Sequence, residues 1–156
     1  MTDCAEFFLR TNGVLPSPQR IAVYRFLRDH PIHATVNTIY RAVREELSSI
    51  SRMTVYNTVK RLVAAGVVAE VIIEDGELRY DANMRPHGHS KCIDCGTVFD
   101  MFPPEGELPV ARLIGLPEGF LVTNVHLCCR GFCRKCRERR ERAWPGALSN
   151  DAIPSA

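Results

Sequence analysis

Two pairs of cysteines, each pair separated by two residues, constrain this chain more than any other feature. The first pair is Cys92 and Cys95, followed by Gly96, and the second is Cys133 and Cys136. Two thiolate pairs supply the four sulfur ligands that Zn²⁺ takes in a closed tetrahedral structural site. A redox-active dithiol is the alternative, but neither pair lies in the βαβ pattern of a thioredoxin-like fold. The sequence therefore predicts a structural zinc site that joins two distant segments.

A second group of potential metal ligands surrounds the first cysteine pair. Carboxylate oxygens and imidazole nitrogens, which suit Fe²⁺, Mn²⁺ or Zn²⁺ better than a thiolate cage does, are offered by Asp81, His87, His89 and Asp100. His87 and His89 are two residues apart, so on an extended strand they project from the same face. A lone His-Gly-His sequence is more often a polar loop. Because aspartates flank it here and a zinc knuckle would fix the adjacent backbone, we expect a second metal site.

Length and composition argue against a secreted protein and against a membrane-spanning one. The 156 residues suffice for one ordinary domain or two small ones, and small domains usually need a cross-link such as zinc. The seven cysteines are an odd number, no N-terminal segment resembles a signal peptide, and no apolar run approaches the ~18 residues of a membrane span. We expect a cytoplasmic protein with reduced thiols and no membrane partner. Cys4, Cys128 and Cys129 lie outside the paired motifs and are expected to be packing or surface thiols.

Apolar periodicity and punctuating residues predict a winged helix-turn-helix in the N-terminal half. Helices are predicted over residues 4–12, 18–30, 36–47 and 52–65, with Thr35 and Ser51 as N-caps and Gly66 ending the last. Strands over 67–74 and 77–81 follow, joined by Asp75-Gly76, a dipeptide favoured in type I′ hairpin turns. In this fold the last helix enters the DNA major groove and the hairpin lies along the DNA backbone.

The distribution of charge supports DNA binding more than the net charge of +2 does. No acidic residue occurs between Ser48 and Ala69, so the basic residues there can face phosphates. The polar side of the last N-terminal helix carries Arg52, Tyr56, Asn57, Lys60 and Arg61. A solvated helix face is the alternative, and the helix-turn-helix context favours DNA over it. A second basic cluster over residues 130–142 is interrupted by glutamates and is predicted to be a solvated helix face.

The expected fold class is α+β, a winged helix-turn-helix followed by a small α+β zinc-stapled dimerisation domain. The predicted boundaries are 1–82 for the DNA-binding domain, 83–86 for a hinge, 87–143 for the dimerisation and metal-binding domain, and 144–156 for a disordered tail. In the second domain we expect strand, knuckle and strand over 88–101, a helix over 105–116 and a strand over 120–129. Small α+β domains with exposed strand edges often pair as two-fold dimers.

Several motifs, in this order, resemble the ferric uptake regulator family of bacterial metal-dependent repressors. They are PQR at Pro18, His-Ala-Thr at His33, TVYNTVKRL at Thr54, RYD at Arg79, HGHSKCIDCG at His87 and GFCRKC at Gly131. The resemblance covers nearly the whole chain apart from the tail. It implies a homodimer that binds a palindromic double-stranded DNA operator and closes one domain onto the other when metal binds.

Within this family the sequence is most similar to the peroxide-sensing branch. That branch holds its regulatory Fe²⁺ or Mn²⁺ on three histidines and two aspartates, which match His33, Asp81, His87, His89 and Asp100. Iron-sensing members commonly have glutamate at the two aspartate positions. The resemblance also implies that the ligands matching His33 and His87 are the ones oxidised by peroxide. Asn57 follows the peroxide-sensing pattern, where iron sensors usually carry arginine.

The resemblance predicts a set of DNA contacts, and the sequence departs from the family pattern at two positions. The expected contacts are Arg20, Arg52, Thr54, Tyr56, Asn57, Lys60 and Arg61. Leu15 stands where members often have a basic residue that reaches the minor groove. Val125 stands where iron sensors usually have a histidine, with His126 facing the other way, so a further metal site is expected to be incomplete although Glu107 matches one of its ligands.

The sequence therefore predicts a metal-dependent, peroxide-responsive transcriptional repressor rather than an enzyme, with structural Zn²⁺ and regulatory Fe²⁺ or Mn²⁺. The alternative in the same class is a repressor that senses Fe²⁺ or Zn²⁺ availability without ligand oxidation. A metallohydrolase is a remote alternative, because no general base stands beside the histidine pair and five ligands leave little room for water and substrate. A dithiol oxidoreductase is weaker still.

Overall fold

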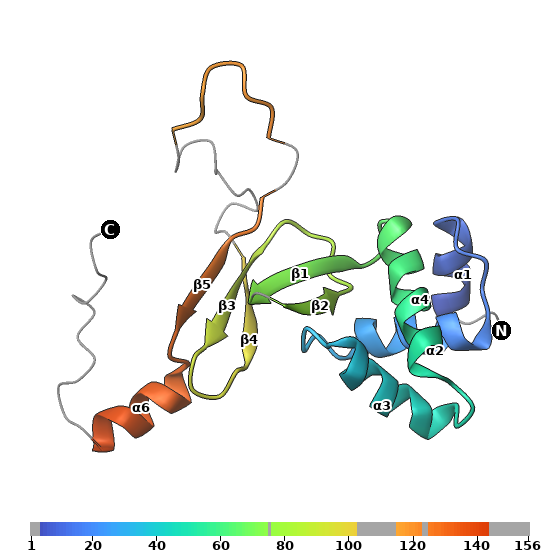
Figure 1. Ribbon diagram of the computed structural model, residues 1–156, viewed down its shortest axis with the longest axis horizontal. Coiled ribbons are helices and arrows are strands. Elements are labelled where there is room, and N and C mark those ends of the chain that lie inside the picture. Colours follow the sequence, from blue (N-terminus) through green and yellow to red (C-terminus); the bar gives the residue numbers. More distant parts are fainter. Residues whose placement is uncertain (1–3, 75, 103–114, 123–124, 144–156) are drawn as a thin grey trace.

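A computed structural model of the chain describes residues 4–74, 76–102, 115–122 and 125–143. Helices come first and strands later along the chain (Figure 1), which confirms the predicted α+β class. In chain order the elements are α1 (Cys4–Thr11), α2 (Pro18–Asp29), α3 (Val36–Glu46), α4 (Arg52–Ala64), β1 (Ala69–Glu74), β2 (Glu77–Asp81), β3 (Gly88–Cys92), β4 (Val98–Met101), β5 (Cys128–Gly131) and α6 (Arg134–Ala143).

Local caps set where α3 and α4 begin and where α4 ends, as predicted. The hydroxyls of Thr35 and Ser51 accept hydrogen bonds from the backbone N–H groups of Thr38 and Thr54, at 3.2 and 3.0 Å. α4 ends at Ala64, and Gly66 follows its C-cap with a φ of 68°, in the left-handed region that glycine adopts without strain. Each cap satisfies backbone groups that the helix itself leaves unpaired.

The main hydrophobic core lies between the four N-terminal helices and the base of the β1–β2 hairpin. Val23, Ile39 and Leu62, from α2, α3 and α4, are completely buried in it. Tyr80 of β2 is also buried there, and its backbone N–H donates to the carbonyl of Ala34 at 3.0 Å. The helices and the hairpin thus form one packed winged helix, and β1 with β2 is called the wing below.

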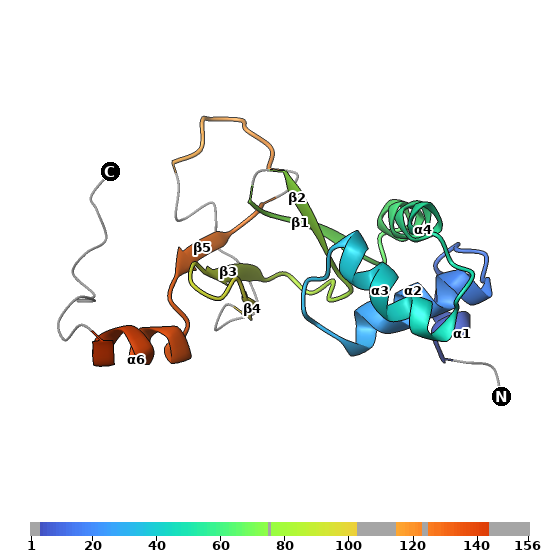
Figure 2. The ribbon, with the colours of Figure 1, turned by 60° about the horizontal axis from the view of Figure 1, so that its bottom comes forward.

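The strands form two separate sheets, the wing and a three-stranded sheet in the order β4-β3-β5. In the second sheet β3 is antiparallel to β4 and parallel to β5. The wing extends from the helices toward this sheet in both views (Figures 1 and 2). Val71 and Ile73 of β1 pack there against Val98 of β4 and the half-buried Cys128 of β5. This small apolar cluster is distinct from the main core and joins the two halves of the chain.

The strand predicted over residues 120–129 is wrong for most of its length. Residues 120–122 and 125–127 are irregular, and β5 begins only at Cys128. Leu121, one of the apolar positions of the predicted strand, is 81% exposed. Alternating polarity identifies side chains that can share a face, but a strand forms only where a neighbouring strand takes its backbone hydrogen bonds. Among the described residues, β3 is paired with this segment in register only from Cys128 onward, and the hydrogen bond from the His89 N–H to the Leu127 carbonyl marks where that pairing begins.

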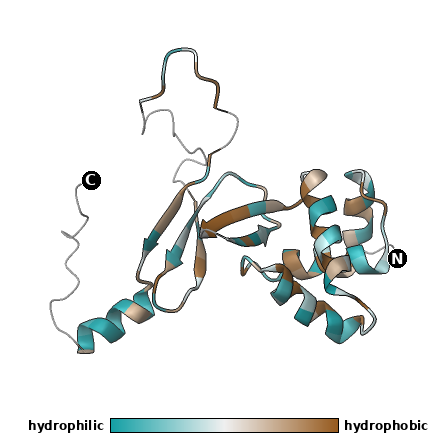
Figure 3. Cartoon of the chain, in the orientation of Figure 1, coloured by the Kyte–Doolittle hydropathy of each residue, from teal (hydrophilic) through white to brown (hydrophobic). Residues whose placement is uncertain are grey.

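Some predictions fall wholly or partly outside the described residues. They are the turn at Asp75, residues 105–114 of the predicted helix, which include Glu107, and the tail over 144–156. The last two residues of that predicted helix, 115 and 116, are described and are irregular. The domain boundaries and the hinge at 83–86 remain predictions. Among the described residues no helix is both long and apolar enough to cross a bilayer. The solvated helix predicted from the basic cluster over residues 130–142 is observed only from Arg134 onward, as α6, which is hydrophilic along nearly its whole length (Figure 3). Arg130, at the start of that cluster, lies instead in β5.

Candidate metal centres and DNA-facing surface

Five side chains that could bind a metal ion, from four segments of the chain, converge in the structure. Their potential ligand atoms all lie within 4.8 Å of one another, and the residues are His33, Asp81, His87, His89 and Asp100. His33 comes from the connection between α2 and α3, and Asp81 from the end of β2. The other three come from β3, the residue before it, and β4. The group, called the His/Asp cluster below, therefore joins the winged helix to the three-stranded sheet.

The spacing of these atoms fits a single ion at their centre. His33 Nε2 lies 2.8 Å from Asp100 Oδ1, and His87 Nε2 lies 3.0 Å from Asp81 Oδ2. The crossed pairs are longer, with His33 Nε2 3.8 Å from Asp81 Oδ2 and His87 Nε2 3.7 Å from Asp100 Oδ1. Around an ion with ligands at about 2.1 Å, neighbouring ligand atoms lie about 3 Å apart and opposite ones about 4.2 Å apart. Three of the four distances fall in that range, and the contact of His33 with Asp100 is slightly shorter, at 2.8 Å.

Six buried polar atoms of the cluster make no hydrogen bond of good geometry among the described residues, although some lie within 3.0 Å of one another. They are both ring nitrogens of His33, Nε2 of His87 and of His89, Oδ2 of Asp81 and Oδ1 of Asp100. Leaving a buried polar atom unpaired costs about 1–3 kcal/mol, so six of them in one place call for a ligand. Three imidazoles with two carboxylates fit Fe²⁺, Mn²⁺ or Zn²⁺. Burial also lowers the pKa of His33, against the opposing effect of Asp100 and Asp81, and so favours the neutral ring that binds metal.

His33 is held in a backbone conformation that ordinary residues avoid. Its φ of 51° is the only positive φ outside glycine in the described part of the chain, and its side chain is buried. The guanidinium of Arg79 donates to the carbonyl of His33 at 3.2 Å, and the next residue, Ala34, is tied to Tyr80. Local strain of this kind persists where surrounding contacts enforce it, often at functional sites. The wing thus aims the imidazole at the cluster.

Outer contacts orient two further members of the cluster. His87 Nδ1 lies 2.6 Å from the carbonyl of Arg85, so its Nε2 faces the other ligand atoms. Asp81 Oδ1 accepts a hydrogen bond from the backbone N–H of Asn83 at 2.8 Å, which leaves Oδ2 for the centre. No sequence pattern predicts these contacts or the role of Arg79. The motif Arg-Tyr-Asp at Arg79 was the one signal that pointed to that position.

Gly88, between the two histidines, allows β3 to approach the segment before β5. A Cβ at this position would lie 3.1 Å from both the carbonyl oxygen and a side-chain carbon of Leu127. The same carbonyl accepts the backbone N–H of His89 at 2.8 Å, so moving it would disturb that histidine. Close backbone packing therefore excludes a side chain between His87 and His89.

Gly88→Ala is expected to destabilise the fold by about 1–2 kcal/mol through overpacking and to weaken metal binding at the His/Asp cluster. Thermal unfolding and Mn²⁺ titration by calorimetry measure the two effects. Gly131→Ala is the matched control, because a Cβ at Gly131 meets nothing within 4 Å. Equal melting and equal Mn²⁺ affinity in both variants would contradict the close-packing argument.

The four paired cysteines form the second cluster, called the thiolate cluster below. Their sulfur atoms also lie within 4.8 Å of one another, and Sγ of Cys95 is 3.9 Å from Sγ of Cys133. Sulfurs bound at about 2.3 Å around tetrahedral Zn²⁺ lie about 3.8 Å apart, so the group fits zinc. Backbone N–H groups of Cys133 and Cys95 lower the pKa of Cys92 to about 6, whereas burial and neighbouring thiols raise the pKa of Cys136 to about 12. A divalent cation would favour the thiolate form of all four.

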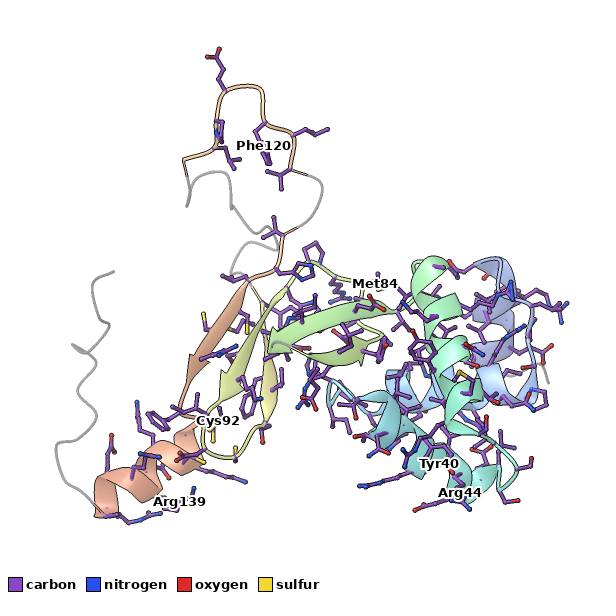
Figure 4. The ribbon with its side chains drawn as sticks, viewed as in Figure 1. Tyr40, Arg44, Met84, Cys92, Phe120 and Arg139 are labelled. Carbon is purple, nitrogen blue, oxygen red and sulfur yellow. The ribbon has the colours of Figure 1, made fainter. Side chains whose placement is uncertain are left out.

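An ion pair ties the first cysteine pair to α6. Asp94, between the two cysteines, accepts hydrogen bonds from Nε and Nη2 of Arg140, the first at 2.7 Å. The guanidinium of Arg140 also lies 4.5 Å from the ring centre of Phe132. Figure 4 places Cys92 close to the start of α6, the helix that also bears Arg139. The second cysteine pair, at the start of that helix, is thereby held against the first.

The residues expected to contact DNA lie mostly on the exposed side of α4. Arg52, Tyr56, Asn57, Lys60 and Arg61 are exposed, whereas Arg20 and Thr54 are half-buried. One groove between α2 and α4 gathers Arg20, Thr54, Asn57 and Arg61. Arg20 also donates to the carbonyl of Leu15 at 2.6 Å, and Leu15 itself is 71% exposed. The arrangement presents cations and hydrogen-bond donors on one surface, as DNA backbone binding requires.

The remaining cysteines and the residues considered for a further metal site lie outside both clusters. Cys4 and Cys129 are exposed, and Cys128 is half-buried in the small apolar cluster with the wing. Val125 is half-buried and His126 exposed, both in the irregular segment before β5. With Glu107 outside the described residues, the incomplete further metal site stays a prediction.

Comparison with known proteins identifies the family. The sequence profile of the Ferric uptake regulator family matches residues 11–127. The chain belongs to the ferric uptake regulator family. As a member of this family it is a metal-responsive transcriptional regulator. The family assignment agrees with the resemblance that the motifs indicated.

Proteins similar to this chain include peroxide-responsive repressors and a manganese uptake regulator. The peroxide-responsive repressor PerR of Staphylococcus aureus (strain USA300) is 33% identical over 132 residues, covering 84% of this chain and 88% of the relative. A zinc-bound manganese uptake regulator is 30% identical with a TM-score of 0.65, covering 83% of this chain and 98% of that one. The Campylobacter jejuni peroxide stress regulator is 26% identical with a TM-score of 0.61, covering 84% and 95%.

Proposed function

We propose that this protein is a peroxide-responsive repressor that binds operator DNA while Fe²⁺ or Mn²⁺ occupies the His/Asp cluster. The observation that carries the proposal is the composition of that cluster, three histidines and two aspartates drawn from both halves of the chain. The similarity to peroxide-responsive repressors over 84% of the chain supports the same function. The thiolate cluster is proposed to hold structural Zn²⁺ in the same protein.

The His/Asp cluster can control DNA binding because its members come from both halves. His33 and Asp81 belong to the winged helix, and His87, His89 and Asp100 to the region of the three-stranded sheet. The five ligand atoms meet only when the winged helix lies against that sheet, so an occupied cluster favours the closed arrangement. Metal at a hundred times its dissociation constant stabilises that arrangement by about 2.7 kcal/mol. This corresponds to about a hundredfold in DNA affinity if the open form scarcely binds.

The same geometry explains how peroxide would release the DNA. Fe²⁺ in this site would supply electrons for the reductive cleavage of hydrogen peroxide beside the imidazoles. Overall, one hydrogen peroxide would oxidise the ring of His33 or His87 to 2-oxo-histidine and would itself be reduced to water, with no net change in the iron. The 2-oxo-histidine ring is a poor ligand, which removes a contact between the halves and opens the protein. The contact of the His87 ring with Phe102, at 5.4 Å between centroids, shields one side of that imidazole.

DNA recognition is proposed to use two copies of the chain. Apolar side chains are exposed in the C-terminal half, among them Phe99, Phe102 and Phe120. A two-fold dimer through this half would cover part of that surface and present two α4 helices to a palindromic operator. The spacing of the two α4 helices would then depend on closure at the His/Asp cluster.

Iron-dependent oxidation of His33 and His87 is the expected result that tests this function. The protein is loaded with Fe²⁺ or Mn²⁺, treated with sub-stoichiometric hydrogen peroxide, and digested for peptide mapping by mass spectrometry. A gain of about 16 Da on the peptides of His33 and His87 is expected with iron only, together with loss of DNA binding, because only iron supplies the electrons. His126, exposed and outside the cluster, is the internal control. Loss of DNA binding without oxidation of either histidine would overturn the proposed trigger.

Sensing of metal availability alone is the second candidate function. Its support is the 30% identity to a manganese uptake regulator of the same fold. A protein of this kind would release DNA as Mn²⁺ is withdrawn and would respond to peroxide equally with either metal. The peptide map above therefore separates the two functions.

A further inference from the structure

One face of the three-stranded sheet carries more than the metal-binding residues. Residues directly opposite one another in neighbouring strands point to the same face. His89 is opposite Asp100 on β4 and Cys128 on β5. One step further along β3, Lys91 is opposite Val98 on β4 and Arg130 on β5. The His/Asp cluster therefore shares its face with a second set of residues, Val98, Cys128 and Arg130.

The wing covers this second set. Val71 and Ile73 of β1 are each only 4% exposed, although they lie outside the main core of the winged helix. They are buried by packing against Val98 and Cys128 of the sheet. Ile72, between them, points away and is 54% exposed. The burial of alternate β1 residues thus depends on the sheet and would be lost if the two halves separated.

A bulge in β1 gives this contact a polar component. The pairing of β1 with β2 shifts register between Ile72 and Glu74, so Ile73 has no partner residue in the ladder. Arg130 Nη2 donates a hydrogen bond to the carbonyl of Ile73 at 2.9 Å. The side chain of Arg130 therefore spans from β5 to the wing and pairs a carbonyl at the bulge.

We propose that Arg130 is a positioning residue that latches the wing to the sheet and so pre-forms the His/Asp cluster. The latch consists of the Arg130–Ile73 hydrogen bond and the apolar contact of Val71 and Ile73 with Val98 and Cys128. Asp81 lies at the other end of the wing, paired with Ala69 on β1. Fixing the bulged end against the sheet keeps Asp81 aligned with His87, His89 and Asp100. This proposal rests on the proposed function. Part of the free energy that favours the closed arrangement would come from a contact that needs no metal.

The coupling between closure and metal binding determines how much the Mn²⁺ affinity should change. A cation that needs the closed arrangement binds with an apparent affinity reduced by the fraction of closed protein. Loss of one hydrogen bond at a partly buried contact is expected to lower that fraction, and therefore the Mn²⁺ affinity, by about three- to tenfold. Saturating Mn²⁺ should restore closure, so the defect is expected mainly at low metal.

The test compares Arg130→Ala, Arg130→Lys and Arg137→Ala in the zinc-loaded full chain. Lysine retains the positive charge and an N–H donor on a long side chain. Arg137→Ala removes the same charge from α6, where Arg137 pairs with Glu141 rather than with the wing. Mn²⁺ affinity is measured by calorimetry, and hydrogen exchange of β1 amides is measured without and with Mn²⁺. Zinc content and thermal unfolding report whether each variant is folded.

Arg130→Ala is expected to bind Mn²⁺ about three- to tenfold more weakly and to exchange β1 amides faster without Mn²⁺, while Arg130→Lys recovers most of both. Arg137→Ala should match the unmodified protein. Equal Mn²⁺ affinity and equal β1 exchange in Arg130→Ala and Arg137→Ala would overturn the latch, as would an Arg130→Lys defect as large as that of alanine. No readout uses peroxide or DNA. Failure of the peroxide response would therefore leave this result standing, and failure of the latch would leave the peroxide response standing.

Discussion

Replacing His33 by asparagine is expected to remove most of the DNA-affinity gain that Mn²⁺ produces, about a hundredfold at saturating metal. Asparagine tolerates the left-handed backbone of this position, where φ is 51°, so the change removes the imidazole without adding strain. Only Asp81 would then remain on the winged-helix side of the His/Asp cluster. With one ligand in place of two, an occupied cluster would hold the closed arrangement far less strongly.

Fluorescence anisotropy on a duplex selected from random sequence by the metal-loaded protein measures this effect with and without excess Mn²⁺. His30→Asn is the matched control, because His30 is an exposed histidine just before the same connection and its ring stacks on Phe26 outside the cluster. Mn²⁺ should strengthen DNA binding of His30→Asn as much as that of the unmodified protein. An equal response in His33→Asn would remove the physical basis of the proposed clamp.

Cys92→Ser is expected to release zinc and to unfold the three-stranded sheet with α6 while α1 to α4 stay folded. The sheet and α6 have little apolar core of their own among the described residues. Their buried apolar and sulfur side chains there are Cys92, Val98 and Cys136, two of which belong to the thiolate cluster. Zinc binding to such a site contributes on the order of 10 kcal/mol, more than the rest of this half can replace. The helices keep a separate and larger core.

Zinc content by elemental analysis and hydrogen exchange resolved by peptide test this second expectation. Protection should be lost in peptides of β3, β4, β5 and α6 and retained in peptides of α2 and α4. Cys129→Ser is the control, because Cys129 is exposed on β5 outside both clusters. Full zinc content and normal protection in Cys92→Ser would show that the thiolate cluster is not what stabilises this half.

Local signals in the sequence were sufficient for much of the fold. The caps at Thr35 and Ser51, Gly66 just after α4 and the antiparallel pairing of the wing are observed as predicted, although β1 begins at Ala69 rather than at Val67. These features depend on interactions within a few residues, so their sequence patterns carry them directly. The grouping of the four paired cysteines was also predictable, because two Cys-x-x-Cys motifs have few other structural uses in such a chain.

Sequence by itself thus determined the element types of the winged helix, the zinc-type cysteine spacing and, through its resemblance to the family, the identity of the five candidate metal ligands. Tertiary structure decided how they meet: the left-handed backbone of His33, the Arg79 hydrogen bond that supports it, and the bulge at Ile73 that receives Arg130. It also decided that β5 starts only at Cys128. Each of these depends on contacts between segments distant in the chain, whose energies leave no periodic pattern in the sequence.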